Sequence, residues 1–292
     1  MTRLHDLHAQ ADQSPWLDNL RRAWITSGEL GRWIDRGVRG ITSNPSIFQK
    51  AMTGTDDYDD QLRSLVTDGA TIEESYWALV VRDIVDALEI MQPVHDASGG
   101  VDGYVSVEVN PVLASDTDGT IAAARDLDER ISRPNLYVKI PATAEGIPAI
   151  QQMISEGRSV NVTLIFSLVR YAEVMEAYLS GLEARDGDLS DVSSVASFFI
   201  SRTDSEVDRR LDAIGGDSAL ALRGRAAVAQ GQVAYEMFRQ VFSGERWEAL
   251  ASRGARVQRP LWASTSTKNP AYSDTLYVDS LIGPDTVNTL PD

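Results

Sequence analysis

The sequence predicts a closed α/β barrel, the (β/α)8 or TIM barrel, in which eight parallel strands alternate with helices. Eight short apolar, β-branched segments recur along the chain, and patterns typical of helices fill the intervals between them. The length of 292 residues suits the roughly 250 residues that such a barrel needs. The predicted strands are residues 16–20, 38–42, 104–109, 136–140, 160–166, 195–200, 260–263 and 286–290.

Several of these segments are nearly continuous in hydrophobicity, which is typical of parallel strands that are buried on both faces. Between them, one apolar stripe at helical spacing runs from Trp77 to Leu88, and another runs from Tyr171 to Leu182. The chain contains no internal repeat, low-complexity tract or linker, so we expect one catalytic domain over residues 1–292.

An open, doubly wound sheet is the other fold that alternating strands and helices can form. An open sheet that binds a nucleotide usually has a glycine-rich turn after its first strand. The one similar segment, residues 27–31, lacks the third glycine and does not lead from a strand directly into a helix. The number of strands therefore favours the closed barrel.

Composition excludes several classes of partner. The net charge of −16 argues against nucleic-acid binding, and no apolar run approaches the roughly 18 residues of a membrane span. The N-terminus has no apolar segment like that of a signal peptide, so we expect a soluble, cytoplasmic protein, either a monomer or a homodimer. The chain has no cysteine, and its three histidines lie in no metal-binding motif, so we expect no metal.

Lysine is rare in this chain, and one lysine stands in an unusual place. Of the 27 basic residues only Lys50, Lys139 and Lys268 are lysines, and Lys139 lies inside the apolar segment LYVKIP. A lysine in an arbitrary strand usually reaches water at an edge or pairs with an acid, but this strand is the fourth of eight and a closed barrel has no edge. Lys139 shares its face with Tyr137 and Pro141, whereas Lys50 is expected to face solvent.

An ammonium group inside a barrel must be paired or lose its proton, and a neutral amine can attack a carbonyl to form a Schiff base. A Schiff base is an electron sink for breaking an adjacent C–C bond. Two carboxylates could serve such a reaction: Asp18 at the end of the first strand and Glu108 in the third. Each alone could simply accept hydrogen bonds or pair with arginine, but together with Lys139 they suit two separate proton-transfer roles that need no cofactor.

Further polar residues lie where strands end, which is where barrel enzymes place their active sites. Asn44 either serves the site or forms an Asn-Pro turn. Asn161 and Thr163 alternate on one strand face together with Ile165, so they are expected to bind substrate and a water, or else to form a satisfied polar layer.

Basic and hydroxyl groups near the last strands suggest a phosphate site, because loops after late barrel strands often hold phosphate. Arg202 follows the sixth strand, and Ser266 and Lys268 follow the seventh in the hydroxyl-rich segment STSTK. An arginine such as Arg202 could also be an ordinary surface residue.

Seven segments resemble the transaldolase family in sequence, order and spacing, and together they extend over nearly the whole chain. They are WLDNL, GITSNPSIFQKAM, VSVEVNP, LYVKIPAT, SVNVTLIFS, SVASFFISR and RPLWASTSTKNP. The resemblance implies a (β/α)8 barrel of the pentose phosphate pathway that transfers a dihydroxyacetone unit between sugar phosphates, without a cofactor. Its reaction converts sedoheptulose 7-phosphate and glyceraldehyde 3-phosphate into erythrose 4-phosphate and fructose 6-phosphate.

The resemblance also implies a role for each candidate residue. Lys139 would form the Schiff base, Asp18 would be the acid and base for C–C cleavage, and Glu108 would shuttle protons through a water held by Thr163. The implied substrate-binding residues orient the dihydroxyacetone hydroxyls, shape the pocket or hold the phosphate, and they are Thr42, Asn44, Ser106, Asn161, Ser197, Phe199, Arg202, Ser266 and Lys268.

The chain departs from the family pattern at two places. Many members have an arginine where this chain has Lys268, and an ammonium grips phosphate less directionally than a guanidinium. The family normally continues beyond Asp292 with helices that cover the site, so we expect either a truncated chain or a naturally short form.

Two other functions remain open from the sequence alone. A fructose-6-phosphate aldolase would use the same lysine, but its subgroup is expected to carry a tyrosine where this chain has Phe199, which favours transfer. A catalytically silent barrel that serves as a binding or scaffold protein would have no need of the intact set of Asp18, Glu108, Lys139 and Thr163, although the missing helices favour it weakly.

Overall fold

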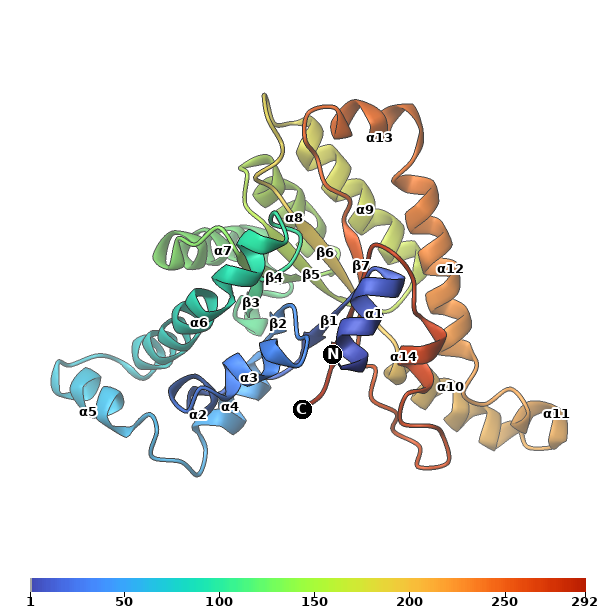
Figure 1. Cartoon of the computed structure of the whole chain (residues 1–292), viewed down its shortest axis with the longest axis horizontal. Helices are drawn as coiled ribbons and strands as arrows, with labels where there is room; N and C mark the ends of the chain where they lie inside the picture. Colours follow the sequence, from blue (N-terminus) through green and yellow to red (C-terminus); the bar gives the residue numbers. More distant parts are fainter. Residues whose placement is uncertain (1) are drawn as a thin grey trace.

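The computed structural model describes residues 2–292, in which eight parallel strands close into a barrel in sequence order (Figure 1). The first strand pairs with the second and, over all five of its residues, with the eighth, so the sheet has no free edge. The strands are β1 (Gln13–Leu17), β2 (Ile41–Thr42), β3 (Val105–Glu108), β4 (Leu136–Pro141), β5 (Val160–Ile165), β6 (Ser194–Phe199), β7 (Arg259–Ala263) and β8 (Thr286–Leu290).

The predicted barrel and the order of its strands are confirmed, with one displaced strand. The first strand was expected at residues 16–20, but β1 ends at Leu17, and Asp18 lies just beyond the sheet with its backbone N–H donating to Leu290 O at 2.8 Å. β2 is short, and the chain just before it passes Trp16 closely: a Cβ on Gly40 would stand 2.4 Å from the indole ring.

Helices surround the sheet (Figure 1) and cover its outer face with apolar side chains. The longest, of 26 residues, begins with a capping box in which Thr71 and Glu74 bond each other's backbone N–H groups. Over residues 2–292, every helix is too short or too polar to cross a lipid bilayer. The helices are α1 (Arg3–Ala11), α2 (Arg22–Thr26), α3 (Glu29–Asp35), α4 (Pro45–Met52), α5 (Asp59–Thr67), α6 (Ile72–Ala97), α7 (Thr117–Ile131), α8 (Gly146–Ser155), α9 (Leu168–Glu183), α10 (Ser201–Ile214), α11 (Asp217–Leu220), α12 (Ala226–Val241), α13 (Gly244–Ala251) and α14 (Leu276–Ser280), with a 3-10 turn, η1 (Pro111–Leu113).

The barrel separates two apolar cores. Val138 and Ile140 of β4 belong to the outer core between sheet and helices, whereas Tyr137 belongs to the core inside the barrel. This alternation confirms that Lys139, on the same face as Tyr137, points inward. Inside, Tyr137 stacks on Tyr104 with ring centres 4.0 Å apart, and Trp16 lies beside both rings. Large aromatic side chains therefore fill the middle of the barrel.

β5 does not keep its alternation to the end. Leu164 has a left-handed backbone (φ 61°), and the register with β6 shifts between Val162 and Ile165. Ile165 consequently lies in the outer core, so the expectation that it shares a face with Asn161 and Thr163 is wrong. The bulge brings Leu164 to the inner side, where it lines a cavity next to Thr163.

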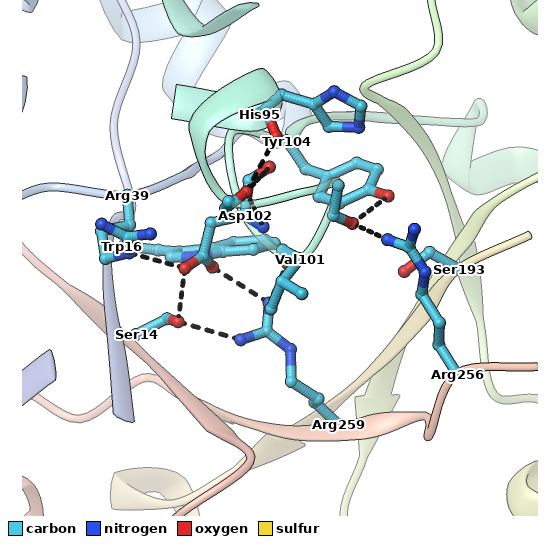
Figure 2. Close-up of polar contacts among 12 residues, drawn as sticks. Ser14, Trp16, Arg39, His95, Val101, Asp102, Tyr104, Ser193, Arg256 and Arg259 are labelled. Atoms are coloured by element: carbon cyan, nitrogen blue, oxygen red, sulfur yellow. Dashed lines mark hydrogen bonds and ion pairs between the residues drawn. The ribbon is translucent and has the colours of Figure 1, made fainter. Parts of the chain in front are cut away.

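A buried ionic cluster lies below the aromatic side chains, at the N-terminal end of the barrel (Figure 2). The fully buried Asp102 accepts hydrogen bonds from Ser14 Oγ (2.8 Å), Trp16 Nε1 (3.1 Å), Arg39 Nε (2.6 Å) and Arg259 Nη2 (3.0 Å). Burial alone would raise the pKa of Asp102, but the guanidinium groups of Arg259 and Arg39 outweigh it and lower that pKa below its usual value. The cluster links two strands, β1 and β7, and two loops, and the sequence analysis did not anticipate it.

We expect Asp102→Asn to lower the free energy of unfolding by about 3–5 kcal/mol at pH 7, because it leaves the buried Arg259 guanidinium without its counter-charge. A lowered carboxylate pKa stabilises the fold above the unfolded-state value of about 3.9, and this stabilisation is lost as pH falls through the folded-state pKa. The difference between wild type and variant, measured by urea denaturation, should therefore stay constant from pH 7 to about pH 5 and shrink as pH falls further.

A surface pair serves as the control for this prediction. Glu89 is 60% exposed and pairs with Arg133 at 2.9 Å. Glu89→Gln removes this ion pair and should lower the free energy of unfolding by about 0–1 kcal/mol. Equal losses in the two variants would mean that the Asp102 cluster contributes no more than a solvated pair.

Candidate active site

A cavity of about 1040 Å³ opens at the C-terminal end of the barrel, where the strand ends converge. Ten of the thirteen residues that the sequence suggested for the site line it, whereas Ser106, Asn161 and Ser266 do not. The ten are Asp18, Thr42, Asn44, Glu108, Lys139, Thr163, Ser197, Phe199, Arg202 and Lys268.

Lys139 lies on the wall of this cavity, only 6% exposed. In the parallel pairing of β3 with β4 it stands opposite Glu108, and its Nζ lies 3.4 Å from Glu108 Oε2. Nζ also donates a hydrogen bond to the backbone oxygen of Ser43 at 3.2 Å. The register of two neighbouring strands thus gives the enclosed ammonium a carboxylate partner within reach of proton transfer.

Asp18 stands on the cavity wall between the ends of β1 and β2. Thr42 Oγ1 donates a hydrogen bond to Asp18 Oδ1 at 2.7 Å, which fixes the orientation of the carboxylate. Within residues 2–292 the second carboxylate oxygen has no hydrogen-bond partner, and the side chain lines the cavity, so this oxygen is available to a ligand. Asp18 and Glu108 therefore occupy separate places around Lys139, as two distinct proton-transfer roles require.

Thr163 carries a hydroxyl that the described residues leave without a partner. Its Oγ1 is buried and makes no hydrogen bond within residues 2–292, although the side chain lines the cavity. A buried hydroxyl without a hydrogen bond is costly, so this position suits a bound water or a ligand hydroxyl. Of the polar groups expected inside the barrel, this one is open to a ligand.

Asn161 is different, because its amide is already satisfied. Its Nδ2 donates to Ser106 Oγ at 3.0 Å, and Ser197 Oγ donates to its Oδ1 at 2.7 Å. Asn161 and Ser106 are fully buried beneath the cavity, and Ser197 forms part of its floor. The sequence allowed two alternatives for Asn161, a substrate contact or a polar layer whose hydrogen bonds are satisfied within the protein. The hydrogen bonds of Asn161 match the second alternative.

Asn44 is a helix cap that also faces the cavity. It caps the N-terminus of α4, where its Oδ1 accepts a hydrogen bond from Ile47 N at 3.0 Å and Pro45 follows it in the first turn. The same side chain lines the cavity. Its amide nitrogen is the donor that it can offer to a ligand.

Two cations stand on the β6–β7 side of the cavity. Arg202 lies in the first turn of α10, with its guanidinium 4.9 Å from the ring centre of Phe199. Lys268 lies in the loop after β7, and its Nζ donates to Ser266 Oγ at 2.6 Å. Ser266 therefore contacts the lysine rather than the cavity. The two cations could hold an anion between them.

The sequence analysis missed several residues on the cavity wall. Lys50 is exposed, as expected, yet it lies in α4 on the rim of the cavity. Its position six residues after Asn44, in the same helix that Asn44 caps, could have indicated this. Thr289 near the end of β8 and Asp292 after it also line the cavity, although the sequence suggested no site residue on this strand. The missed residues include Arg21, Lys50, Leu164, Thr289 and Asp292.

The described residues hold no group of three or more His, Cys, Asp or Glu side chains that could ligate a metal ion. The cavity instead combines an enclosed primary amine, a paired carboxylate, a second carboxylate, an open hydroxyl and two cations. Such a set can form an imine with a carbonyl compound, move protons on two sides of it and hold an anionic group at one end.

Comparison with known proteins gives one consistent result. A family model described as Transaldolase/Fructose-6-phosphate aldolase matches residues 15–292. "Transaldolase 1" of Streptomyces avermitilis is 54% identical over 96% of this chain and 75% of its own length. "Transaldolase" of Parafrankia sp. is 53% identical over 99% of this chain and 79% of its own, and "Transaldolase" of Saccharopolyspora erythraea is 51% identical over 100% and 80%.

Proposed function

The chain belongs to the transaldolase/fructose-6-phosphate aldolase family and is a transaldolase, and we propose that Lys139 forms the Schiff base of its reaction. The observation that carries this proposal is the enclosed Lys139 ammonium, 3.4 Å from Glu108 at the end of a closed barrel. Lys50 and Lys268 are exposed and lack such a carboxylate partner among the described residues.

The reaction begins with proton transfer at Lys139. Glu108 takes a proton from the ammonium, and the freed amine adds to the carbonyl carbon of a ketose phosphate. The carbonyl oxygen then collects protons through Glu108 and a water held at Thr163, and it leaves as water. The unpartnered Thr163 hydroxyl supports this assignment, because it can hold that water. A protonated Schiff base remains on Lys139.

Asp18 acts on the bond that breaks. It takes the proton of the C4 hydroxyl, the C3–C4 bond cleaves, and the electron pair moves into the Schiff base as an enamine. The C4 oxygen becomes the carbonyl of the departing aldose phosphate. An acceptor aldehyde then reverses these steps: the enamine carbon attacks it, Asp18 returns a proton to the new hydroxyl, and water releases the product ketose. The hydrogen bond from Thr42 supports Asp18 in this role, because it leaves one carboxylate oxygen for the substrate.

The proposed substrates are sedoheptulose 7-phosphate and glyceraldehyde 3-phosphate, which places the enzyme in the pentose phosphate pathway. Arg202 and Lys268 would bind the phosphate, while Asn44 and Ser197 would contact the dihydroxyacetone hydroxyls. Phe199 packs against Phe166 with ring centres 5.1 Å apart and offers no hydroxyl to activate water, which favours transfer over release of the fragment. The single domain over residues 1–292, the cytoplasmic location and the monomeric or homodimeric state stay predictions from the sequence.

We expect Lys139→Ala to abolish trapping of the enzyme by borohydride in the presence of fructose 6-phosphate, because only an imine is reduced to a stable adduct. Peptide mass mapping of the wild type should place the adduct on Lys139, and far-UV circular dichroism should show that the variant is folded. Lys50→Ala removes another lysine on the same cavity and should still be trapped. An adduct mapped to Lys50 or Lys268 would refute the assignment.

Asp18→Asn should slow C–C cleavage by about 10² to 10⁴, the usual contribution of a general acid or base, while the Schiff base still forms. Rapid-quench experiments with borohydride should show adduct accumulating in this variant. Asp57→Asn is the control, since Asp57 is an exposed carboxylate at the rim of the same cavity. Turnover near the wild-type rate in Asp18→Asn would make Asp18 a structural residue.

Lys268→Ala should raise KM for fructose 6-phosphate by about 10- to 100-fold, since a hydrogen bond to a charged group contributes about 1.5–3 kcal/mol. KM for unphosphorylated fructose should change far less. Arg202→Ala should act in the same direction and more strongly, and Lys268→Arg should be tolerated. Steady-state kinetics on both substrates decides the matter: equal losses with and without phosphate would assign Lys268 to the fold.

A further inference from the structure

Two tyrosines from the chain segment after β7 donate hydrogen bonds to two aspartates of α10, the helix that begins with Arg202 in its first turn. We propose that one of these pairs, Asp208 with Tyr272, positions Lys268 relative to Arg202 and thereby determines how tightly the enzyme holds phosphate. The proposal rests on the proposed function, because it takes these two cations as the phosphate-binding groups. Asp208 and Tyr272 are positioning residues, since neither lines the main cavity.

Lys268 needs such a support because its own surroundings do not fix it. Arg202 is part of a helix of 14 residues, but Lys268 is exposed and lies in the irregular segment between β7 and α14. Its hydrogen bond goes to Ser266, which belongs to the same segment and moves with it. Before Lys268 the segment is also held to β8, because Thr265 Oγ1 bonds to Asn288 Oδ1 (2.9 Å) and Thr289 O (2.8 Å). The distance between the two cations therefore depends most on how the segment is attached to α10 after Lys268.

The segment is attached to α10 on both sides of Lys268. Before it, Ser264 accepts a backbone hydrogen bond from Ser201 N at 3.1 Å, and the two hydroxyls lie 2.9 Å apart. After it, Tyr272 Oη donates to Asp208 Oδ2 at 2.6 Å. Ser264 and Tyr272 each lie four positions from Lys268 in sequence, so the two attachments bracket it evenly.

Tyr272 is held firmly at this point. Asp208 is 9% exposed, and its other oxygen accepts a hydrogen bond from Gly224 N at 3.0 Å. Gly224 has a left-handed backbone (φ 70°), and a Cβ there would stand 2.9 Å from the Tyr272 ring, so the ring packs directly on the glycine. Burial and the hydrogen bond to Asp208 raise the pKa of Tyr272 to about 12, so the phenol stays a proton donor at neutral pH.

The three residues also share one small pocket. Lys268, Asp208 and Tyr272 all line a second cavity of about 260 Å³, and Lys268 lines the main cavity as well. Lys268 thus stands on the wall between the two spaces, next to three aspartates of α10: Asp204, Asp208 and Asp212. If the attachment at Tyr272 is lost, the ammonium can turn toward these carboxylates and away from the substrate phosphate.

The chain provides a matched control in Tyr277. Its hydroxyl donates to Asp204 Oδ2 at 2.9 Å, and Asp204 Oδ1 accepts from Ala227 N at 2.7 Å, so the chemistry resembles that of the first pair. Tyr277, however, is buried in α14, nine positions beyond Lys268 in sequence. Tyr272→Phe and Tyr277→Phe each delete one tyrosine–aspartate hydrogen bond to α10, and both tyrosines line the small pocket that Lys268 also lines. Only Tyr272 lies in the loop between β7 and α14 that carries Lys268, so only the first change releases that loop.

Tyr272→Phe should raise KM for fructose 6-phosphate about tenfold, the lower end of what a hydrogen bond to a charged group contributes, with kcat and the KM for unphosphorylated fructose nearly unchanged. The dissociation constant of inorganic phosphate, measured by calorimetry, should rise by the same factor. Tyr277→Phe should lower the melting temperature without changing either value. Adding Asp208→Ala to Tyr272→Phe should cost less than the sum of the two single changes, because both remove the same bond.

The outcomes separate this proposal from the proposed function. Equal increases in KM for Tyr272→Phe and Tyr277→Phe, or equal losses with and without the substrate phosphate, would overturn the positioning role. Calorimetry with inorganic phosphate requires no turnover, so it tests the positioning role even if Lys139 forms no adduct. Unchanged phosphate affinity in Tyr272→Phe would overturn the role, whereas failure of borohydride trapping in the wild type would count against the Schiff base alone.

Discussion

A closed parallel barrel gives Lys139 no edge at which to reach water, and the arrangement of the site follows from that constraint. An enclosed ammonium needs a counter-charge, and the register of β3 on β4 supplies Glu108 directly opposite. The remaining groups approach from other strand ends: Asp18 after β1 and the unpartnered hydroxyl of Thr163 on β5. Each strand contributes one or two groups to a shared space, so the chemistry depends on closure of the sheet rather than on any local motif.

The interior of the barrel separates stability from chemistry. Stacked aromatic side chains, Tyr104, Tyr137 and Trp16, fill its middle. Below them every oxygen of the Asp102 carboxylate accepts hydrogen bonds from the protein. Above them the hydroxyl of Thr163 has no partner within residues 2–292, which leaves it available to a ligand. Substitutions at the two ends should therefore affect different properties of the enzyme.

The sequence predicted the features that depend on local pattern. Apolar runs revealed the strands, and polar residues at their ends revealed ten of the residues that line the cavity, because parallel strands bring their C-terminal ends together. The sequence did not predict contacts between distant segments. Nothing in the local sequence indicates that Ser14, Arg39 and Arg259 contact Asp102. The saturated amide of Asn161 and the attachment of Tyr272 to Asp208 were missed for the same reason. The end of β1 was misjudged because WLDNL continues the apolar run past Leu17, where pairing with β8 ends.

The bulge at Leu164 lets two consecutive residues of one strand face the cavity. In a regular strand only every second side chain faces inward, so inward groups are spaced about 6.6 Å apart along the wall. The left-handed backbone of Leu164 interrupts this rule, and Thr163 and Leu164 both line the cavity as immediate neighbours. One strand thereby places a hydroxyl and an apolar side chain on the cavity wall within a single residue's rise.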